Sequence, residues 1–127
     1  MNTSVSIDAA SRFIERLKPL PVAARRLLCV IVKQAYHGPL LSKTLGVATM
    51  PEVLEACGVD VDQLYALLDP LKQARLIEVG GEYPFEEMRL AADSEIAKTI
   101  AHECERAKIP LEDVFVELRI EVLQAAW

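Results

Sequence analysis

The side chains best suited to bind a metal or to act as nucleophiles are two histidines and three cysteines. His102 and Cys104 are two positions apart in a segment expected to be helical, so their side chains point in different directions. Together with His37, Cys29 and Cys57 they do not form the ligand spacing of a zinc site. We therefore expect no metal site, and we expect Cys29 and Cys104 to be small core residues. Cys57, near an expected helix end, is either a redox thiol or another packed cysteine.

Acidic residues occur in adjacent pairs, but their context does not favour acid–base catalysis. Glu86 and Glu87 are neighbours in an expected strand, and Glu112 and Asp113 are neighbours in an expected helix, so we expect both pairs to be solvated. The chain contains no glycine-rich phosphate loop, no nucleophile elbow and no Ser/His/Asp arrangement. We expect a protein that is not an enzyme and that has no cofactor.

Length and charge limit the remaining function classes. A chain of 127 residues is expected to form one domain, 1–127, with an aliphatic core. The net charge is −5, but residues 1–37 hold six Lys/Arg against two acids, whereas residues 76–127 hold five against twelve. Binding to nucleic acid would therefore need a local basic surface. No apolar run reaches the roughly 18 residues of a membrane span. No secretory signal is apparent, and an odd number of cysteines is typical of reduced thiols, so we expect a cytoplasmic protein.

Apolar residues repeat at helical spacing through most of the chain. Thr49 and Glu52 have the spacing of a capping box at the start of a short helix that ends at Gly58, and Asp60 caps the helix that follows. Helices are expected over residues 6–18, 21–36 and 61–74, from Asp93 to the break at 109–110, and from 110 to near the end; strands are expected over 76–79 and 82–91.

Secondary structure is less regular in three segments. Gly80 and Gly81 predict a two-residue hairpin turn between the strands, because both can adopt positive φ at low cost. Residues 39–48 fit either a short strand or a short helix. Pro70 indicates that the third helix consists of two segments, 61–69 and 70–75, because a proline inside a helix costs about 3 kcal/mol.

The order of these elements, with the segment "LYALLDPLKQARLIEV" followed by Gly80-Gly81, resembles the winged helix-turn-helix superfamily. The resemblance covers residues 22–91, and the flanking helices are similar to those of small dimeric bacterial regulators such as the MarR and PadR families. It implies a mainly α fold with a small β-hairpin wing, in which the winged helix-turn-helix core is flanked by an N-terminal helix at 6–18 and two C-terminal helices in 93–127. In many relatives a glycine ends the third helix, whereas this chain has Arg75. The wing carries Glu82, Glu86 and Glu87 where MarR-type wings usually carry a basic residue.

The resemblance implies a transcriptional regulator that binds double-stranded DNA as a dimer. Gln63 in the third helix has the chemistry to pair with an adenine, but no arginine is placed there to read a guanine. Residues 60–91 hold three Lys/Arg against seven acids, so the first helices would have to contribute cations. The alternative is a winged-helix module that binds protein and not DNA. The candidate DNA-binding residues are Gln63, Tyr65, Lys72, Arg75, Arg25 and Arg26.

The last helix is expected to have two apolar faces, which indicates that it is packed on both sides. One face comprises Leu111, Val114, Phe115, Leu118, Val122 and Ala125, and the other comprises Val116, Ile120, Leu123 and Trp127. Either the helix lies inside this chain's own fold, or the second face packs against a partner subunit in a two-fold dimer. We favour the dimer, with Val116, Ile120, Leu123 and Trp127 at its interface.

Overall fold

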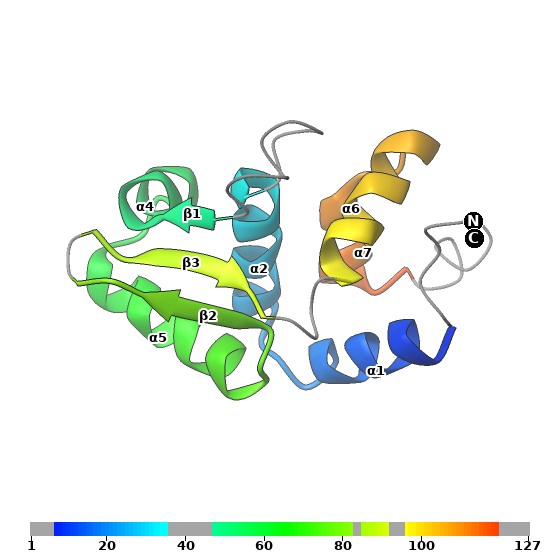
Figure 1. The fold of residues 1–127 in the computed structure, drawn as a ribbon, viewed down its shortest axis with the longest axis horizontal. Helices are drawn as coiled ribbons and strands as arrows, with labels where there is room; N and C mark the ends of the chain where they lie inside the picture. Colours follow the sequence, from blue (N-terminus) through cyan, green and yellow to red (C-terminus); the bar gives the residue numbers. More distant parts are fainter. Residues whose placement is uncertain (1–6, 36–46, 83–84, 92–95, 120–127) are drawn as a thin grey trace.

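The computed structural model describes residues 7–35, 47–82, 85–91 and 96–119. In these ranges the chain forms six helices and a three-stranded antiparallel sheet, which confirms the expected mainly α fold with a small wing (Figure 1). The elements are α1 (Ile7–Leu17), α2 (Val22–Ala35), β1 (Val47–Thr49), α4 (Met50–Cys57), α5 (Val61–Gln73), β2 (Ile77–Gly80), β3 (Glu87–Leu90), α6 (Ile96–Ala107) and α7 (Leu111–Glu117). None of the described helices is long and apolar enough to cross a bilayer.

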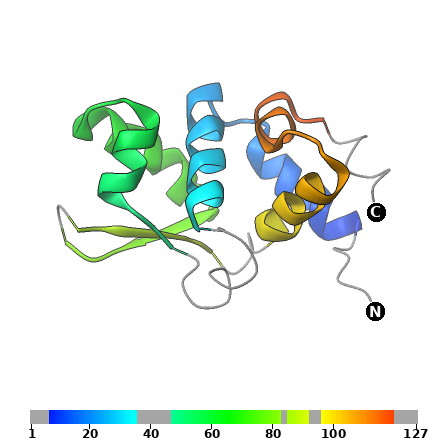
Figure 2. The same cartoon turned by 90° about the horizontal axis from the view of Figure 1, so that it is seen from above.

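Helix α2 is the centre of the molecule. Its buried residues occupy most of its circumference, because the sheet and helices α4 and α5 pack on one side of it and helices α6 and α7 on the other (Figures 1 and 2). Arg26 and Lys33 are exposed on this helix. The core residues of α2 are Ala24, Leu27, Leu28, Cys29, Ile31, Val32 and Ala35.

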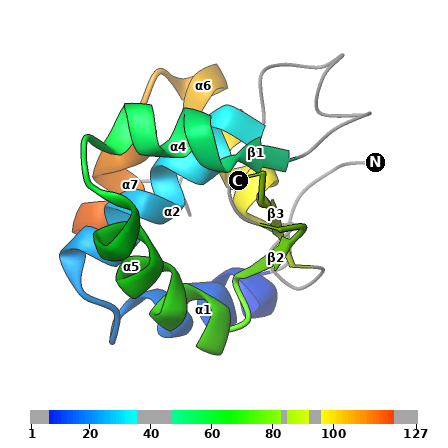
Figure 3. The same ribbon diagram turned by 90° about the vertical axis from the view of Figure 1, so that its left-hand side faces the viewer.

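The sheet has the strand order β1-β3-β2, so the C-terminal strand of the wing lies between the other two. Strand β1 begins at Val47, within the segment for which the sequence allowed either a strand or a helix; residues 39–46 lie outside the described ranges. Viewed from the winged end, α4 and α5 lie on one side and the strands on the other (Figure 3).

The wing does not turn at two glycines. Gly80 still pairs with Glu87 at the end of β2, so the connection spans residues 81–86, and the predicted Gly80–Gly81 turn and the predicted strand start at residue 82 are wrong. Gly81 has a φ of 88°, and a Cβ there would lie 3.3 Å from the backbone oxygen of Phe85. Gly81 therefore allows a close approach within a longer loop, closed by the Phe85 amide donating to the Glu82 carbonyl at 2.6 Å.

Helix α5 continues through Pro70, so the predicted break between 61–69 and 70–75 is wrong. Proline removes one hydrogen bond, because it has no N–H for the carbonyl four residues earlier. Leu68 and Leu71 on either side of it are both buried, as is Leu64 one turn earlier. Tertiary packing of this apolar face holds the helix together across the proline.

Two helices end in the same motif with a cationic residue in the left-handed conformation. After α5, Arg75 has a φ of 60°; after α6, Lys108 has a φ of 62°. The amide of Leu76 donates to the carbonyl of Leu71, and the amide of Ile109 donates to that of Cys104. With the amides of Arg75 and Lys108 each donating to the carbonyl three residues earlier, both ends are Schellman motifs. Arg75 thus occupies the backbone position at which many winged-helix proteins place glycine.

We expect Arg75→Gly and Lys108→Gly each to raise the free energy of unfolding by about 0.5–1 kcal/mol. An L-residue in this conformation is strained by about 1–2 kcal/mol, and glycine offsets part of the gain through its greater freedom in the unfolded chain. Urea unfolding measures the change. Ala74→Gly is the control, because Ala74 has a right-handed φ of −78° and glycine there is destabilising. The explanation fails if Ala74→Gly and Arg75→Gly shift stability in the same direction.

Helix α7 is shorter than the sequence predicts. It ends at Glu117, and Leu118 adopts φ 56° and ψ 48°, a left-handed conformation that stops the helix. The expectation of a helix from 110 to near the end of the chain is therefore wrong. Of the predicted second apolar face, Val116 lies in the described helix, and Ile120, Leu123 and Trp127 follow it in the sequence. These three lie outside the described residues, whereas Val116 is half-buried.

Candidate nucleic-acid interface

Helices α4 and α5 form a helix-turn-helix unit. Helix α4 ends at Gly58, which has a left-handed φ of 68° and donates its amide to the Leu54 carbonyl at 3.0 Å. Two residues later Asp60 caps α5, as the sequence predicts. At the start of α4, the Thr49 amide and hydroxyl donate to Glu52 at 3.4 and 2.8 Å, in agreement with the predicted pairing of these residues. Local capping thus fixes the direction of both helices.

Gln63 is part of the cap of α5. Its backbone amide donates to the Asp60 carboxylate at 2.8 Å, and its side-chain oxygen accepts from the Asp60 amide at 3.2 Å. The side chain is exposed, and its amide nitrogen carries the two donors that the capping box does not use. Gln63 is therefore held at the N-terminal end of α5 in a defined position.

Tyr65 connects α5 to the base of the wing. Its hydroxyl donates to one carboxylate oxygen of Glu86, which is only 7% exposed. The Glu86 backbone oxygen accepts from the Met50 amide at 2.9 Å, so the same residue also holds the start of α4. The second carboxylate oxygen of Glu86 is buried and has no hydrogen-bond partner in the described structure. The expectation that the pair at residues 86 and 87 is solvated is wrong for Glu86, because Glu86 is buried and accepts the hydrogen bond from Tyr65.

The outward face of α5 is acidic. Asp62, Ala66, Asp69 and Gln73 are all exposed, and their spacing places them on one stripe of the helix. The sequence contains no Lys or Arg from residue 47 to residue 71. This stripe is an exposed, acidic part of α5.

The candidate cations lie away from that stripe. Lys72 and Arg75 are exposed at the C-terminal end of α5. Near the start of α2, Arg26 is exposed and Arg25 is half-buried, with an Nε atom that has no partner in the described residues. The structure thus brings Lys72 and Arg75 into one turn, whereas Arg25 and Arg26 belong to a different helix packed against α5.

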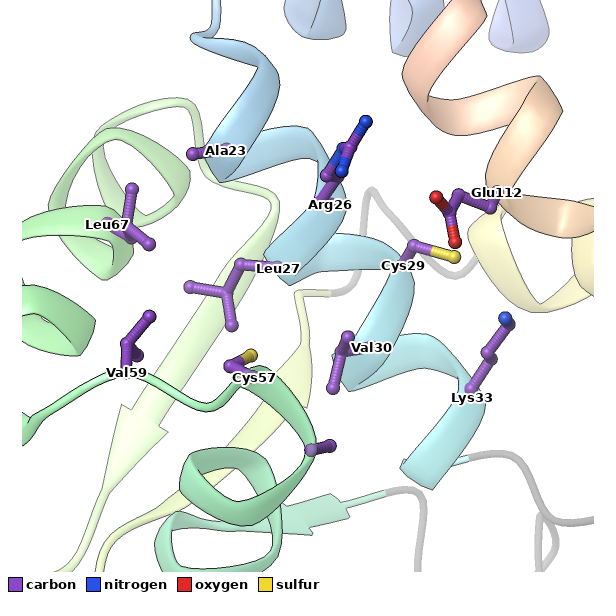
Figure 4. Close-up of a pocket in the computed structure, with 11 residues that line it drawn as sticks. Ala23, Arg26, Leu27, Cys29, Val30, Lys33, Cys57, Val59, Leu67 and Glu112 are labelled. Atoms are coloured by element: carbon purple, nitrogen blue, oxygen red, sulfur yellow. The ribbon is translucent and has the colours of Figure 1, made fainter.

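A groove of about 290 Å³ adjoins the helix-turn-helix unit (Figure 4). Its walls come from α2, from the end of α4 and the turn after it, from Leu67 of α5 and from Glu112 of α7. Sequence reasoning missed it, because four separate segments build it. Arg26 and Lys33, seven residues apart on α2, are among its lining residues. A second groove of about 230 Å³ lies on the other side of Lys33, against α6.

Burial keeps the thiols protonated. Burial raises the pKa of Cys29 to about 11, an effect that Lys33 partly opposes, and it raises the pKa of Cys104 to about 11. The pKa of half-buried Cys57 is also raised by burial. Cys29 and Cys104 are core residues, as expected. In the described ranges no three His, Cys, Asp or Glu side chains lie close enough together to hold a metal ion.

Comparison with known proteins finds no matching protein family. It also finds no matching curated protein. Among solved structures, the chain is similar to BpsR of Bordetella bronchiseptica, whose DNA binding is regulated by 6-hydroxynicotinic acid. The identity is 15%, the TM-score is 0.46, and the match covers 98% of this chain and 96% of BpsR. A likeness at this level carries no information about which ligands this chain binds.

Proposed function

We propose that this protein is a winged-helix transcriptional regulator that binds double-stranded DNA. The observation that supports this proposal is the connected unit formed by α4, α5 and the three-stranded sheet. In this unit, Tyr65 and Glu86 hold α5 against the base of the wing. A helix-turn-helix presents the N-terminal half of its second helix to the major groove. We further propose that the protein acts in the cytoplasm, because all three of its cysteines are free thiols.

The candidate residues have different roles in this proposal. Gln63 is at the N-terminal end of α5, where its two free donors can contact base edges. Tyr65 positions α5 relative to the wing through Glu86. Lys72 and Arg75 contact phosphates, and Arg25 and Arg26 add cationic charge from α2. Because the outward stripe of α5 is acidic, we expect binding to be weak and to depend strongly on salt.

The two Schellman motifs provide a matched pair of variants that tests this proposal. Arg75→Gly and Lys108→Gly each remove one positive charge, and each replaces a left-handed residue with glycine. Only Arg75 lies next to α5. We expect Arg75→Gly to weaken binding to a labelled duplex by about three- to ten-fold. The log–log slope of affinity against salt should become shallower by about 1, the contribution of one phosphate contact.

Lys108→Gly should leave duplex affinity within about two-fold of the wild type. The loss of one phosphate contact would weaken binding by more, about three- to ten-fold. Fluorescence anisotropy at low salt measures both variants. If they weaken binding equally, the effect is that of net charge, and the assignment of Arg75 is wrong.

A second function is favoured by the acidic stripe on α5: the winged-helix unit binds a basic protein surface and not DNA. Asp62→Asn/Asp69→Asn separates the two functions. If α5 faces DNA, removing two acidic charges should strengthen binding to the duplex. If α5 faces a basic partner, removing them should weaken binding to that partner. The probes are the labelled duplex and a lysine-rich peptide, measured under the same conditions.

We also propose that the protein is a homodimer, with Val116, Ile120, Leu123 and Trp127 at the interface. Val116 is the described member of this group, and it is half-buried at the end of α7. Light scattering at tens of micromolar should give twice the mass of the chain, and Ile120→Asp should halve it. A monomeric wild-type protein, or an unchanged mass for Ile120→Asp, would exclude this interface.

A further inference from the structure

The side chain of Gln63 has an acceptor and a pair of donors, and the fold already uses the acceptor. The Asp60 backbone amide donates to Gln63 Oε1 at 3.2 Å, and the Gln63 backbone amide donates to the Asp60 carboxylate at 2.8 Å. Because a backbone amide can only donate, its partner on Gln63 must be the oxygen and not the nitrogen. The side chain is exposed, so the nitrogen with its two donors is the part that Gln63 offers to a partner.

This division of the Gln63 amide affects base recognition, because the two purines present different edges in the major groove. Adenine presents one acceptor and one donor, and glutamine pairs with it through its oxygen and its nitrogen together. Guanine presents two acceptors, O6 and N7. An adenine would therefore have to share the Gln63 oxygen with the Asp60 amide, whereas a guanine needs only the free donors. The positive end of the α5 dipole also favours acceptors at the N-terminal end of this helix.

We infer that the capping box of α5 sets a base preference: Gln63 donates to a guanine and does not form the adenine pair expected from its residue type. The inference rests on the proposed binding to double-stranded DNA, and it names the base that this end of α5 recognises. It also assigns a guanine contact to a helix that contains no arginine. Asp60 is a positioning residue, because its backbone amide holds the Gln63 oxygen.

Selection from a pool of duplexes with a randomised core tests the inference. The full-length protein is mixed with the pool at about 50 mM salt, and the bound duplexes are sequenced. We expect a position at which guanine is enriched over adenine by at least about five-fold, as expected for a good base contact. In Gln63→Met, which lacks the donors, this preference should fall below about two-fold while the other positions keep theirs.

Gln63→Glu reverses the hydrogen-bonding character of the side chain and keeps the cap. Glutamate at this position of a capping box also accepts from the backbone amide of the capping residue, so the variant should fold. It replaces two donors with an acceptor. The preference at the same position should therefore change from guanine to cytosine, whose amino group is a donor in the major groove.

Two substitutions of Asp60 test whether the cap causes the preference. Asp60→Pro removes the backbone donor, and the φ of −82° at this position is close to that of proline. The Gln63 oxygen is then free, so adenine should rise to within about two-fold of guanine. Asp60→Ala is the matched control, because it removes the same carboxylate but keeps the amide, so the preference for guanine should remain.

Failure of the inference and failure of DNA binding give different results. Saturable binding with adenine preferred at the Gln63-dependent position, or with no position altered by Gln63→Met, would overturn the inference and leave DNA binding intact. The same preference in Asp60→Pro and Asp60→Ala would overturn the role of the cap. No saturable binding of the pool by protein at about 100 μM would contradict DNA binding and the inference with it.

Discussion

Phe115→Ala is expected to lower the free energy of unfolding by about 3–5 kcal/mol, because it truncates a large buried aromatic side chain. Phe115 in α7 is fully buried, and its ring packs on Phe13 of α1 with the centroids 5.8 Å apart and the planes inclined at 56°. This pair joins the N-terminal helix to the last described helix. Truncation leaves a cavity where the two helices meet, in addition to the lost burial.

The control for this prediction is Phe85→Ala. Phe85 is 76% exposed, so the same change of side chain there should alter stability by less than about 0.5 kcal/mol. A double-mutant cycle with Phe13→Ala should give a coupling of about 0.5–1.5 kcal/mol for the aromatic pair. If Phe115→Ala prevents folding, Phe115→Leu makes the cycle measurable. A loss of less than about 1 kcal/mol for Phe115→Ala would contradict the described packing of α1 and α7.

Tyr65→Phe is expected to lower the free energy of unfolding by about 1–3 kcal/mol, because it removes the hydroxyl that donates to buried Glu86. One carboxylate oxygen of Glu86 has no partner within the described structure. The variant also removes the hydrogen bond that the other carboxylate oxygen accepts from Tyr65. Urea unfolding at neutral pH measures the loss. Glu87→Gln, at the exposed neighbouring position, is the control and should change stability by less than about 0.5 kcal/mol.

Replacing both partners distinguishes a lost hydrogen bond from a packing defect. In Tyr65→Phe/Glu86→Met no buried polar group is left unsatisfied, so most of the stability should return. A packing defect at residue 65 would persist in the double variant. If Tyr65→Phe is as stable as the wild type, then Glu86 is not held by this contact, and the proposed link between α5 and the wing is wrong.

Elements governed by local chemistry could be predicted from the sequence. The caps at Thr49 and Asp60, the stop at Gly58 and the central helix α2 all depend on neighbouring residues and on apolar spacing, and the structure contains them. Arg75 stands in the sequence where many winged-helix proteins have a helix-ending glycine, and its positive φ agrees with that position.

Features that depend on distant parts of the chain could not be predicted. Pro70 stays within α5 because Leu68 and Leu71 pack against the core, and Glu86 is buried because Tyr65, 21 residues earlier, reaches it. The end of α7 at Leu118 contradicts the apolar spacing, which would allow the helix to continue. The groove at Arg26 and Lys33 has walls from four segments, so no local pattern reveals it.

We propose that the winged-helix unit binds double-stranded DNA despite the acidic stripe on α5. Fluorescence anisotropy of a labelled duplex, titrated with the full-length protein at about 50 mM and then at about 200 mM salt, tests it most directly. We expect saturable binding at the lower salt, with a log–log salt slope of about −2 to −4 from two to four phosphate contacts. No binding at about 50 mM salt with protein at about 100 μM, where the electrostatic contribution is largest, would contradict it.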